Sequence, residues 1–500
     1  MEMVRRLKQL MPNWLKQRAL LTPNRSAISF AGQTLTFSEL YEAAYEMAGK
    51  LNTCGLKRQQ FAAVLLQNHL DTAIILLALQ LLGVRAVILN NRLTAEELVW
   101  QVKDSQAAFL ISEDLFAEKR EKILFQITNF PQVTKEMLAS SVRFCKPNEC
   151  TEVDMEEICT IMYTSGTTGH PKGVIQTYGN HWWSATGSAL NLGLQENDCW
   201  LCAVPLFHIS GYSILMKCII YGMKIVLHEK FDAEKTLQDI DSEHVTIMSV
   251  VGSTLIRVIE QLHEDKLPDY FRCMLLGGGP ASLSLLEECV VKNVPVYQTY
   301  GMTETSSQIV TLSPEDSIRK LGSAGKPLFP SQLKVLADDT REAAACEAGE
   351  ITVKGPNVTS GYLNRNDASR KDIQDGWLHT GDIGYLDEEG FLFVLDRRSD
   401  LIISGGENIY PAEIEGVLTS HPAVMDAGVI GREDDKWGRV PAAFIVKKAP
   451  VTSDELLQFC KEKLAKYKIP KHFYFIDEIP RNASKKILRR ELRTLLKVNY

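Results

Sequence analysis

Short apolar runs separated by segments of helical period dominate the first three hundred residues. They occur at 61–66, 84–89, 107–111, 158–163, 200–204, 245–250 and 272–276. Apolar runs of this length that alternate with helices are typical of parallel strands covered by helices on both faces. The pattern therefore predicts an α/β fold of doubly wound sheets, with ligand loops at the carboxyl ends of the strands.

The most apolar stretch, 72–89, has the length of a membrane span. Gln80, Gly83 and Arg85 interrupt it. These residues favour a buried helix that ends at Gly83 and a buried strand over 84–89. We therefore expect no membrane span.

The pattern of apolar and polar residues along the chain changes after about residue 330. In the short segments 349–354 and 391–395, apolar and polar residues alternate, as in strands with one exposed face. This pattern predicts a small β-rich subdomain. Beyond the charged stretch 396–400 a new unit begins, with a helix that starts at Pro411. Its second helix begins after Thr452, which has Glu455 three residues on, as in a capping box.

These patterns divide the chain into a large N-terminal domain over 1–396, a hinge over 397–400 and a small α+β domain over 401–500. The 500 residues are too many for one core, and 45% hydrophobic with 23% charged residues is ordinary globular composition. The net charge of −7 argues against a nucleic-acid or membrane-surface partner, since both attract positive proteins.

Eleven cysteines are scattered without the spacing of a disulfide framework. Cys199 and Cys202 form a C-x-x-C pair, but they lie in an apolar strand-like run with no second pair for zinc, which favours core packing. The N-terminus lacks an apolar signal core. Together these features predict a cytoplasmic protein with reduced thiols.

The segment TSGTTGHPKG, 164–173, lies between two strand-like runs. Its glycines let backbone amides face a ligand, its hydroxyls donate hydrogen bonds, and its lysine adds positive charge. Pro171 and the strand that follows exclude a Walker A loop, and a plain Ser/Gly linker is rarely flanked by buried strands. We therefore expect a phosphate-binding loop that includes Thr164, Ser165, Gly166, Thr167, Thr168, Gly169 and Lys172.

Four further segments supply groups suited to a nucleotide. GGGP at 277–280 leaves room for a flat base, and YGMTET at 300–305 offers an aromatic ring, a hydroxyl donor and, in Glu304, a carboxylate for Mg²⁺. Asp382 can accept from ribose hydroxyls, and Arg397 can reach ribose or phosphate oxygens. Taken singly, an Asp after Gly is more often a turn residue and an Arg a surface residue. The nucleotide contacts expected from these segments are Gly278, Gly279, Pro280, Tyr300, Gly301, Met302, Thr303, Asp382 and Arg397.

In this order, the segments resemble the motifs of the adenylate-forming superfamily of acyl-CoA synthetases, peptide adenylation domains and luciferases, over nearly the whole chain. The resemblance implies that the large domain holds ATP and the acid, and that the small domain begins near Arg397. It places the hinge at Ser399 and the catalytic lysine at Lys486. Relatives usually have S-G-K where this chain has Ser484, Lys485 and Lys486, and often Asp or Lys at the hinge.

The resemblance also implies two half-reactions, with ATP and Mg²⁺ in the first and coenzyme A in the second. A rotation of the mobile small domain would withdraw Lys486 and bring in the segment SGGEN at 404–408, where Gly405 and Gly406 leave room for pantetheine. His208 occupies the position of an aromatic or His gate at the acyl pocket. It would shape the thiol channel or act as a general base for the thiol.

Several longer segments resemble one subgroup of CoA ligases, whose acid is aromatic and carries a keto group and two carboxylates. The residues expected to line its pocket, together with Gly278 and Thr303, are Ser210, Gly211, Ser253, Thr254 and Gln308. A ligase for a fatty or simple aryl acid, an adenylation domain serving a carrier protein, and a catalytically inactive nucleotide-binding regulator are the alternatives. The expected partners are small molecules, and the sequence leaves open whether the chain forms a homo-oligomer.

Overall fold

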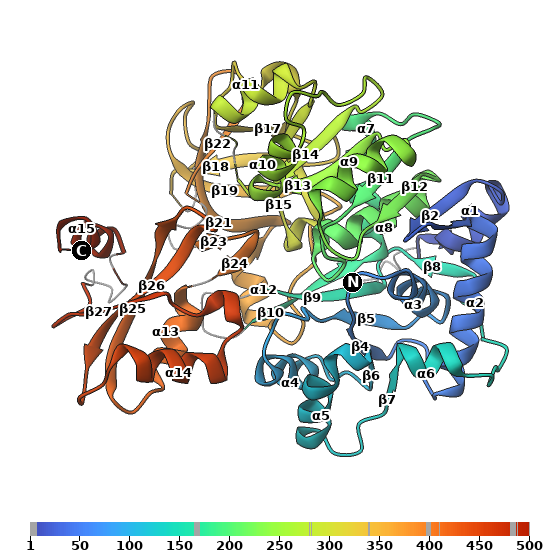
Figure 1. Ribbon diagram of the computed structural model, residues 1–500, viewed down its shortest axis with the longest axis horizontal. Coiled ribbons are helices and arrows are strands. Elements are labelled where there is room, and N and C mark those ends of the chain that lie inside the picture. The colour runs from blue at the N-terminus through green and yellow to red at the C-terminus, as the bar shows by residue number, and fades with distance from the viewer. Residues whose placement is uncertain are drawn as a thin grey trace, which may run out of the picture.

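A computed structural model describes residues 8–164, 171–279, 281, 283–338, 341–396, 402–409, 411–480, 487 and 489–499. Figure 1 shows a large domain built on two sheets and a small C-terminal domain at its side. The predicted α/β class is confirmed. Within the described ranges, no helix combines the length and the apolar character that crossing a bilayer requires.

The first sheet has the strand order β10-β9-β5-β4-β6-β7. All neighbours are parallel except β10, which is antiparallel to β9. The helix α3 (Leu70–Leu81) is buried almost throughout, and Gly83 beyond its end has a φ of +63°, as the sequence predicts. The strands are β4 (Phe61–Leu65), β5 (Arg85–Ile88), β6 (Phe109–Ser112), β7 (Gln132–Thr134), β9 (Ile158–Thr164) and β10 (Lys172–Thr177).

The second sheet has a parallel centre covered on both faces. Its parallel strands are β2 (Ser26–Phe30), β12 (Lys224–Leu227), β11 (Cys199–Cys202), β13 (Ile247–Val251), β14 (Cys273–Gly277) and β15 (Val296–Met302). The helix α8 (Ile209–Tyr221) packs on one face of this centre, whereas α10 (Gly252–Gln261) packs on the other. Cys199 and Cys202 are both buried and free, in agreement with a packing role.

The β-rich part is not separate from this sheet. The antiparallel strand β16 (Ser307–Leu312) pairs with β15, and β17 (Ser323–Pro327) pairs with both β16 and β22 (Leu392–Asp396). The sheet then continues through β21 (Trp377–Leu386), β19 (Gly349–Lys354) and β18 (Gln332–Leu336), and β3 (Gln33–Thr36) closes the other edge beside β2. Sequence patterns predict the strands but not this long-range pairing.

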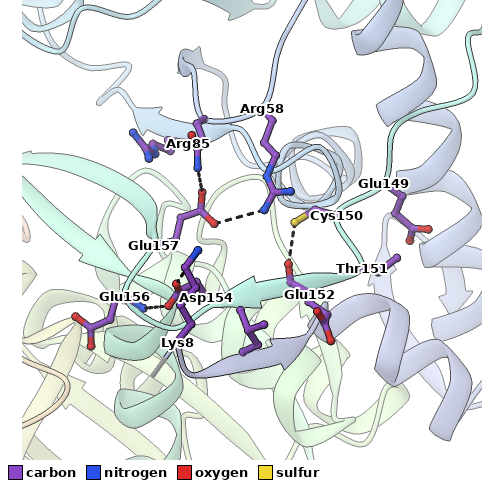
Figure 2. Close-up of a pocket in the computed structure, with 12 residues that line it drawn as sticks. Lys8, Arg58, Arg85, Glu149, Cys150, Thr151, Glu152, Asp154, Glu156 and Glu157 are labelled. Atoms are coloured by element: carbon purple, nitrogen blue, oxygen red, sulfur yellow. Dashed lines mark hydrogen bonds and ion pairs between the residues drawn. The ribbon is translucent and has the colours of Figure 1, made fainter. Parts of the chain in front are cut away.

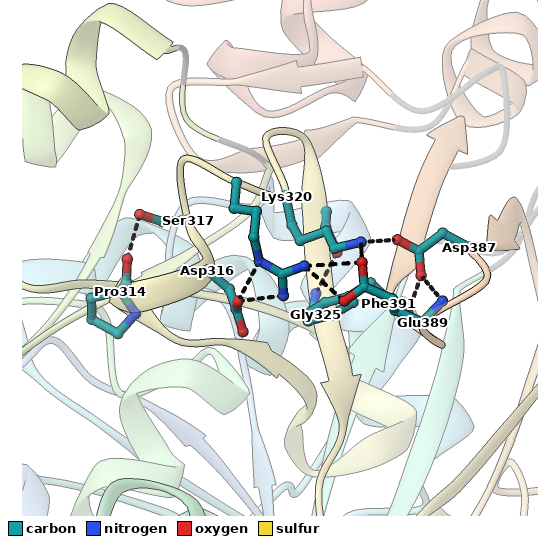
Figure 3. Close-up of polar contacts among 10 residues, drawn as sticks. Pro314, Asp316, Ser317, Lys320, Gly325, Asp387, Glu389 and Phe391 are labelled. Carbon is teal, nitrogen blue, oxygen red and sulfur yellow. Dashed lines mark hydrogen bonds and ion pairs between the residues drawn. The ribbon is translucent and has the colours of Figure 1, made fainter.

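Ion pairs link two turns of the β-rich part. Lys320 contacts the carboxylates of Asp387 at 2.6 Å and Glu389 at 2.5 Å, while Arg319 bridges Glu389 and Asp316. Figure 3 shows this cluster beside Phe391. The pairs tie the chain before β17 to the turn between β21 and β22, and so brace the strand that ends just before the predicted hinge.

The small domain has its own sheet and cores. Its strands are β23 (Ile402–Ser404), β24 (Glu407–Ile409), β25 (Val424–Asp434), β26 (Gly438–Lys447) and β27 (His472–Phe475), and its helices are α13 (Pro411–Thr419), α14 (Ser453–Lys463) and α15 (Arg489–Asn499). The helix α13 begins at Pro411, and Thr452 and Glu455 form the predicted capping box of α14. Both local predictions are confirmed.

Candidate active site

Lys172 is held at the end of the predicted phosphate loop. Its ammonium lies 2.7 Å from a carboxylate oxygen of Asp372 and 4.6 Å from the ring centre of Tyr362. Asp372 ends the helix α12 (Asn366–Asp372), which the sequence analysis did not connect with the site. A phosphate that binds Lys172 therefore competes with a carboxylate already in place.

Glu304 joins two motifs that are far apart in the sequence. Its Oε1 lies 3.5 Å from the hydroxyl of Thr164 and accepts a hydrogen bond from the hydroxyl of Tyr362 at 3.3 Å. Within the described segments, no group of three His, Cys, Asp or Glu side chains is arranged to hold a metal. A Mg²⁺ at Glu304 would therefore take its other ligands from phosphate oxygens and water, which is how Mg²⁺ usually binds.

Asp382 and Tyr300 form a buried pair. The tyrosine hydroxyl donates to the carboxylate at 2.7 Å, and the backbone N–H of Asp382 donates to the hydroxyl of Thr380 at 3.0 Å. Tyr300 thus orients the carboxylate, in addition to any stacking by its ring. An oriented carboxylate is suited to a pair of ribose hydroxyls.

The glycines predicted to contact ligand are of two kinds. Gly278 and Gly279 have φ values of +92° and +156°, and a Cβ on Gly279 would meet no atom within 4 Å, so open space lies above the turn. A Cβ on Gly211 would lie 2.2 Å from the carbonyl oxygen of Pro205, and one on Gly301 would lie 2.1 Å from that of Ser307. Backbone packing alone explains the glycine at these last two positions.

Among the residues predicted to line the acid pocket, Gln308 most clearly lacks hydrogen-bond partners. It is 3% exposed, and neither amide atom of its side chain has a hydrogen-bond partner in the described chain. Ser210 lies in the first turn of α8, and Ser213, one turn further, hydrogen-bonds Ser307 next to Gln308 at 3.2 Å. A polar ligand that reaches this side chain would satisfy the Gln308 amide. The other predicted lining residues, Ser253 and Thr254, begin α10.

The turn before β24 brings the small domain onto the large one. Gly405 and Gly406 have φ values of +55° and +86°, and a Cβ on Gly406 would lie 3.3 Å from a methyl group of Val251. Glu407 follows, 5% exposed, and pairs with Arg92 and with His208, whose Nε2 lies 3.3 Å from its Oε2. Arg92 and Glu407 were not singled out from the sequence, because nothing local connects them.

His208 is the N-cap residue of α8 and lies where the two domains meet. Burial lowers its pKa, and the charge of Arg92 lowers it further. The imidazole is therefore neutral at pH 7, with one nitrogen available to donate and the other to accept. This state is compatible with either predicted role, the gate or the base.

A second interdomain contact surrounds Lys468. Its ammonium lies 2.7 Å from Glu97 of the large domain and 2.7 Å from Glu413 of the small domain. Burial lowers the pKa of Lys468, but the two carboxylates outweigh this effect and raise it overall. Burial raises the pKa of Glu413 to about 7. Neighbouring Asn90 and Tyr467 contact each other across the same boundary at 3.5 Å.

Several predicted site residues lie outside the described residues, and they stay predictions. They are the loop residues Ser165, Gly166, Thr167, Thr168 and Gly169, the base-site residue Pro280, the residues Arg397 and Ser399 with the hinge 397–400, and the catalytic lysine Lys486. Met302 and Thr303 lie in or beside the strand end that carries Tyr300 and Glu304. The described members of the predicted nucleotide site thus come from strand ends of both sheets, except Asp382, which lies within β21.

A separate cavity of about 480 Å³ lies near the N-terminus. Its wall holds five carboxylates and three basic side chains. Figure 2 shows Glu149, Glu152 and Glu157 among them, the last of which lies 4.0 Å from Arg58. Polyphosphates are repelled by such a surface. This cavity is therefore a poor candidate for the nucleotide site.

Comparison with known proteins identifies the family. The family model described as AMP-binding enzyme matches residues 15–363, and the model described as AMP-binding enzyme C-terminal domain matches 413–486. The chain is 55% identical over 488 residues to a 2-succinylbenzoate–CoA ligase of Bacillus cereus, covering 98% of this chain and 99% of that protein.

Solved structures of the o-succinylbenzoate CoA synthetase of Bacillus subtilis are 51% identical to the chain. A double mutant of that enzyme bound to a product analogue has a TM-score of 0.92, covering 97% of this chain and 98% of that one. Its complex with the acyl-adenylate intermediate has a TM-score of 0.76 at the same coverage, and its complex with ATP and magnesium has 0.76, covering 97% and 100%. The predicted resemblance is confirmed, and the chain belongs to the AMP-binding enzyme family.

Proposed function

We propose that the protein is an ATP-dependent ligase that converts 2-succinylbenzoate to 2-succinylbenzoyl-CoA through an acyl-AMP intermediate, a step of menaquinone biosynthesis. The observation that carries this proposal is the similarity to 2-succinylbenzoate–CoA ligases over 98% of the chain. The site agrees with it, because Lys172 and Glu304 lie at strand ends where a nucleotide can bind, and Tyr300, near the end of β15, holds the carboxylate of Asp382.

The first half-reaction makes the acid reactive. A carboxylate oxygen of the acid attacks the α-phosphate of ATP, the bond to the β-phosphate breaks, and pyrophosphate leaves. Lys172 and Mg²⁺ on Glu304 would neutralise the leaving group, and Asp382 would hold the ribose. Lys486 would stabilise the charge that develops at the α-phosphate, where a positioned donor contributes most.

The second half-reaction transfers the acyl group to coenzyme A. The thiol sulfur attacks the acyl carbon and gives up its proton to water or to His208, the bond between the acyl carbon and the phosphate oxygen breaks, and AMP leaves. The turn at Gly405 and Gly406, seated on Val251, would guide the pantetheine arm past neutral His208. Because His208 pairs with Glu407, it is oriented before coenzyme A arrives.

We infer that the described domain arrangement is the one for thioester formation. The Bacillus subtilis enzyme superposes with a TM-score of 0.92 when it is bound to the product analogue, but only 0.76 when it is bound to the acyl-adenylate. Because the enzyme is the same in both comparisons, the difference in TM-score mainly reflects how one rigid domain is placed relative to the other. The contacts of Glu407 and Lys468 would then belong to the second half-reaction.

The remaining expectations follow from the chemistry. All eleven cysteines are free, which suits a cytoplasmic protein in a reducing compartment. The proposed partners are the acid, ATP, Mg²⁺ and coenzyme A, and a homo-oligomer stays an open prediction.

A substrate panel tests the proposed function. Exchange of labelled pyrophosphate into ATP should depend on the acid, with 2-succinylbenzoate far ahead of benzoate and decanoate, and thioester should form only with coenzyme A. Equal exchange with all three acids would refute the substrate assignment. If none of the acids supported exchange, the proposal that the protein is an adenylate-forming enzyme would be wrong.

Replacing Asp382 by Ala should weaken ATP binding by about 10- to 100-fold, because a hydrogen bond to a charged group contributes about 1.5–3 kcal/mol. Tyr300→Phe keeps the ring but loses the hydroxyl that orients Asp382, and it should give a smaller loss of the same kind. Titration calorimetry with ATP measures both. Asp387→Ala, which removes the largely buried carboxylate that pairs with Lys320, serves as the control. Unchanged affinity in Asp382→Ala would remove this carboxylate from the site.

Replacing Lys468 by Met should slow thioester formation more than adenylate formation. The change leaves Glu97 and Glu413 buried without their cation, and breaking a buried pair costs about 3–5 kcal/mol. The part of that cost that comes from Glu97 falls on the described arrangement alone, because Lys468 and Glu413 both belong to the small domain. Separate assays of pyrophosphate exchange and thioester release measure the two steps, with Lys471→Met as an exposed control, and an equal loss in both steps would contradict the assignment.

Replacing Lys486 by Ala should abolish adenylate formation, with a loss of about 10² to 10³ or more in rate, because one positioned charge is removed. Transfer from preformed acyl-AMP to coenzyme A should change much less, since the rotation withdraws this lysine. Lys485→Ala is the matched control. An inactive Lys485→Ala beside a normal Lys486→Ala would move the catalytic lysine by one residue.

A further inference from the structure

Asp372 and Lys172 form a largely buried ion pair beside the phosphate loop. The ammonium of Lys172 donates to the carboxylate of Asp372 at 2.7 Å, and each side chain is 14% exposed. Of the cations that the structure describes, only Lys172 lies within 4 Å of this carboxylate. Arg370 and Lys371 are close in sequence, on the same helix, but both are exposed and neither pairs with it. The carboxylate is therefore directed at the lysine of the predicted phosphate site.

The place of Asp372 in its helix does not explain a carboxylate. Asp372 is the last residue of α12, where the negative end of the helix dipole disfavours a negative charge. The next residue begins β20 (Ile373–Gln374), which pairs with β21, so the backbone is fixed on both sides. Lys172 supplies the positive charge that this carboxylate needs.

Tyr362 places the ion pair next to the proposed magnesium ligand. Its ring centre lies 4.6 Å from the ammonium of Lys172, and its hydroxyl donates to Glu304 at 3.3 Å. The backbone here is fixed, because the N–H of Leu363 donates to the carbonyl of Gly173 at 2.8 Å. Lys172 and Glu304 therefore flank one tyrosine ring, and the lysine can leave Asp372 by rotation of its side chain alone.

A phosphate on Lys172 and the carboxylate of Asp372 compete for one ammonium. A phosphate oxygen bonded to Lys172 lies about 2.7–2.9 Å from its nitrogen. While Lys172 stays on Asp372, the two anions are thus at most about 6 Å apart, where like charges repel and burial limits screening by salt. Lys172 must either turn from Asp372 to the phosphate or bind the phosphate weakly.

We infer that Asp372 is the internal counter-anion of the phosphate site. It holds Lys172 while the site is empty, releases it to the polyphosphate of ATP and takes it back as pyrophosphate leaves. Asp372 is thus a positioning residue that acts through Lys172 and keeps the affinity for pyrophosphate low, so that this product departs before coenzyme A reacts. The inference rests on the proposed function, which makes pyrophosphate a product. The competing explanation is an ion pair that only anchors α12.

The test measures the affinity for magnesium pyrophosphate in Asp372→Asn. The amide keeps the size of the side chain and removes its charge, so the affinity should rise at least about 10-fold, the effect of one charge on another about 4–6 Å away. Titration calorimetry measures the dissociation constant, and the pyrophosphate concentration that half-inhibits thioester formation should fall by the same factor. A merely structural ion pair predicts the opposite change, because a disturbed loop binds its ligand less tightly.

Three control variants show whether the carboxylate acts through Lys172. Asp372→Glu retains the charge and should leave the affinity close to that of the wild-type protein. Asp367→Asn removes an exposed carboxylate from the first turn of the same helix and should change nothing. Lys172→Met should weaken binding, and adding Asp372→Asn to it should no longer tighten binding. Equal tightening with and without Lys172 would show simple repulsion and overturn the inference.

Melting curves keep the test decisive if a variant is unstable. Asp372→Ala also removes the charge, and it leaves room for water at the ammonium. Either variant should melt at a lower temperature than the wild-type protein without ligand, yet gain more in melting temperature from magnesium pyrophosphate, since tighter binding stabilises the folded state more. If neither variant folds, the ion pair is structural and the inference is overturned.

The outcomes separate the inference from the proposed function. If the wild-type protein neither binds magnesium pyrophosphate nor exchanges it into ATP with any acid, the proposed function fails and the inference fails with it. If the wild-type protein does both, and a folded Asp372→Asn or Asp372→Ala binds pyrophosphate no more tightly than the wild-type protein, the function stands and the counter-anion is overturned.

Discussion

The buried carboxylate of Glu407 is the contact on which the described arrangement depends. It belongs to the small domain, is 5% exposed, and is held by Arg92 and His208 of the large domain. Burying a carboxylate without such partners is costly. The two domains can therefore meet at this point only when Glu407 is paired with them, and otherwise they separate. The adjacent Gly406 lies against Val251 of the large domain, where a Cβ would come within 3.3 Å of a methyl group.

Charged contacts also suit an interface that has to open. Glu407, Lys468 and their partners can be hydrated when the domains separate, whereas a large apolar interface would resist rotation. Each domain keeps its own core, and among the described residues of the small domain Ala465 and Tyr467 pack into the core of the first sheet. The architecture thus combines rigid domains with a polar boundary, as two half-reactions at one site require.

Local features of this fold could be predicted from the sequence. The buried strands, the helix end at Gly83 and the capping box at Thr452 depend on neighbours within a few residues, and patterns record such neighbours well. The continuity of the second sheet into the β-rich part could not be predicted, because β17 pairs with β22 nearly seventy residues away. The same limit hid Arg92 with Glu407, and Glu97 with Lys468, which are 315 and 371 residues apart.

In the candidate site too, local motifs could be predicted from the sequence, whereas contacts between distant segments could not. Motifs located Lys172, Glu304 and Asp382, but the groups that hold them, Asp372, Tyr362 and the hydroxyl of Tyr300, emerge only from the folded chain. The roles of Lys486 and Arg397 rest on the family motifs.

The central claim is that the described arrangement serves the second half-reaction and that the small domain rotates between the two. Spin labels at exposed Glu121 in α5 (Ala117–Gln126) and Glu462 in α14, in a background with Cys145 and Cys346 replaced by serine, measure it directly. With a stable analogue of the thioester product, the distance distribution should match the described structure. With ATP, Mg²⁺ and the acid, a second, distinct distance should appear. A single unchanged distribution in both conditions, from protein that still turns over, would contradict the account.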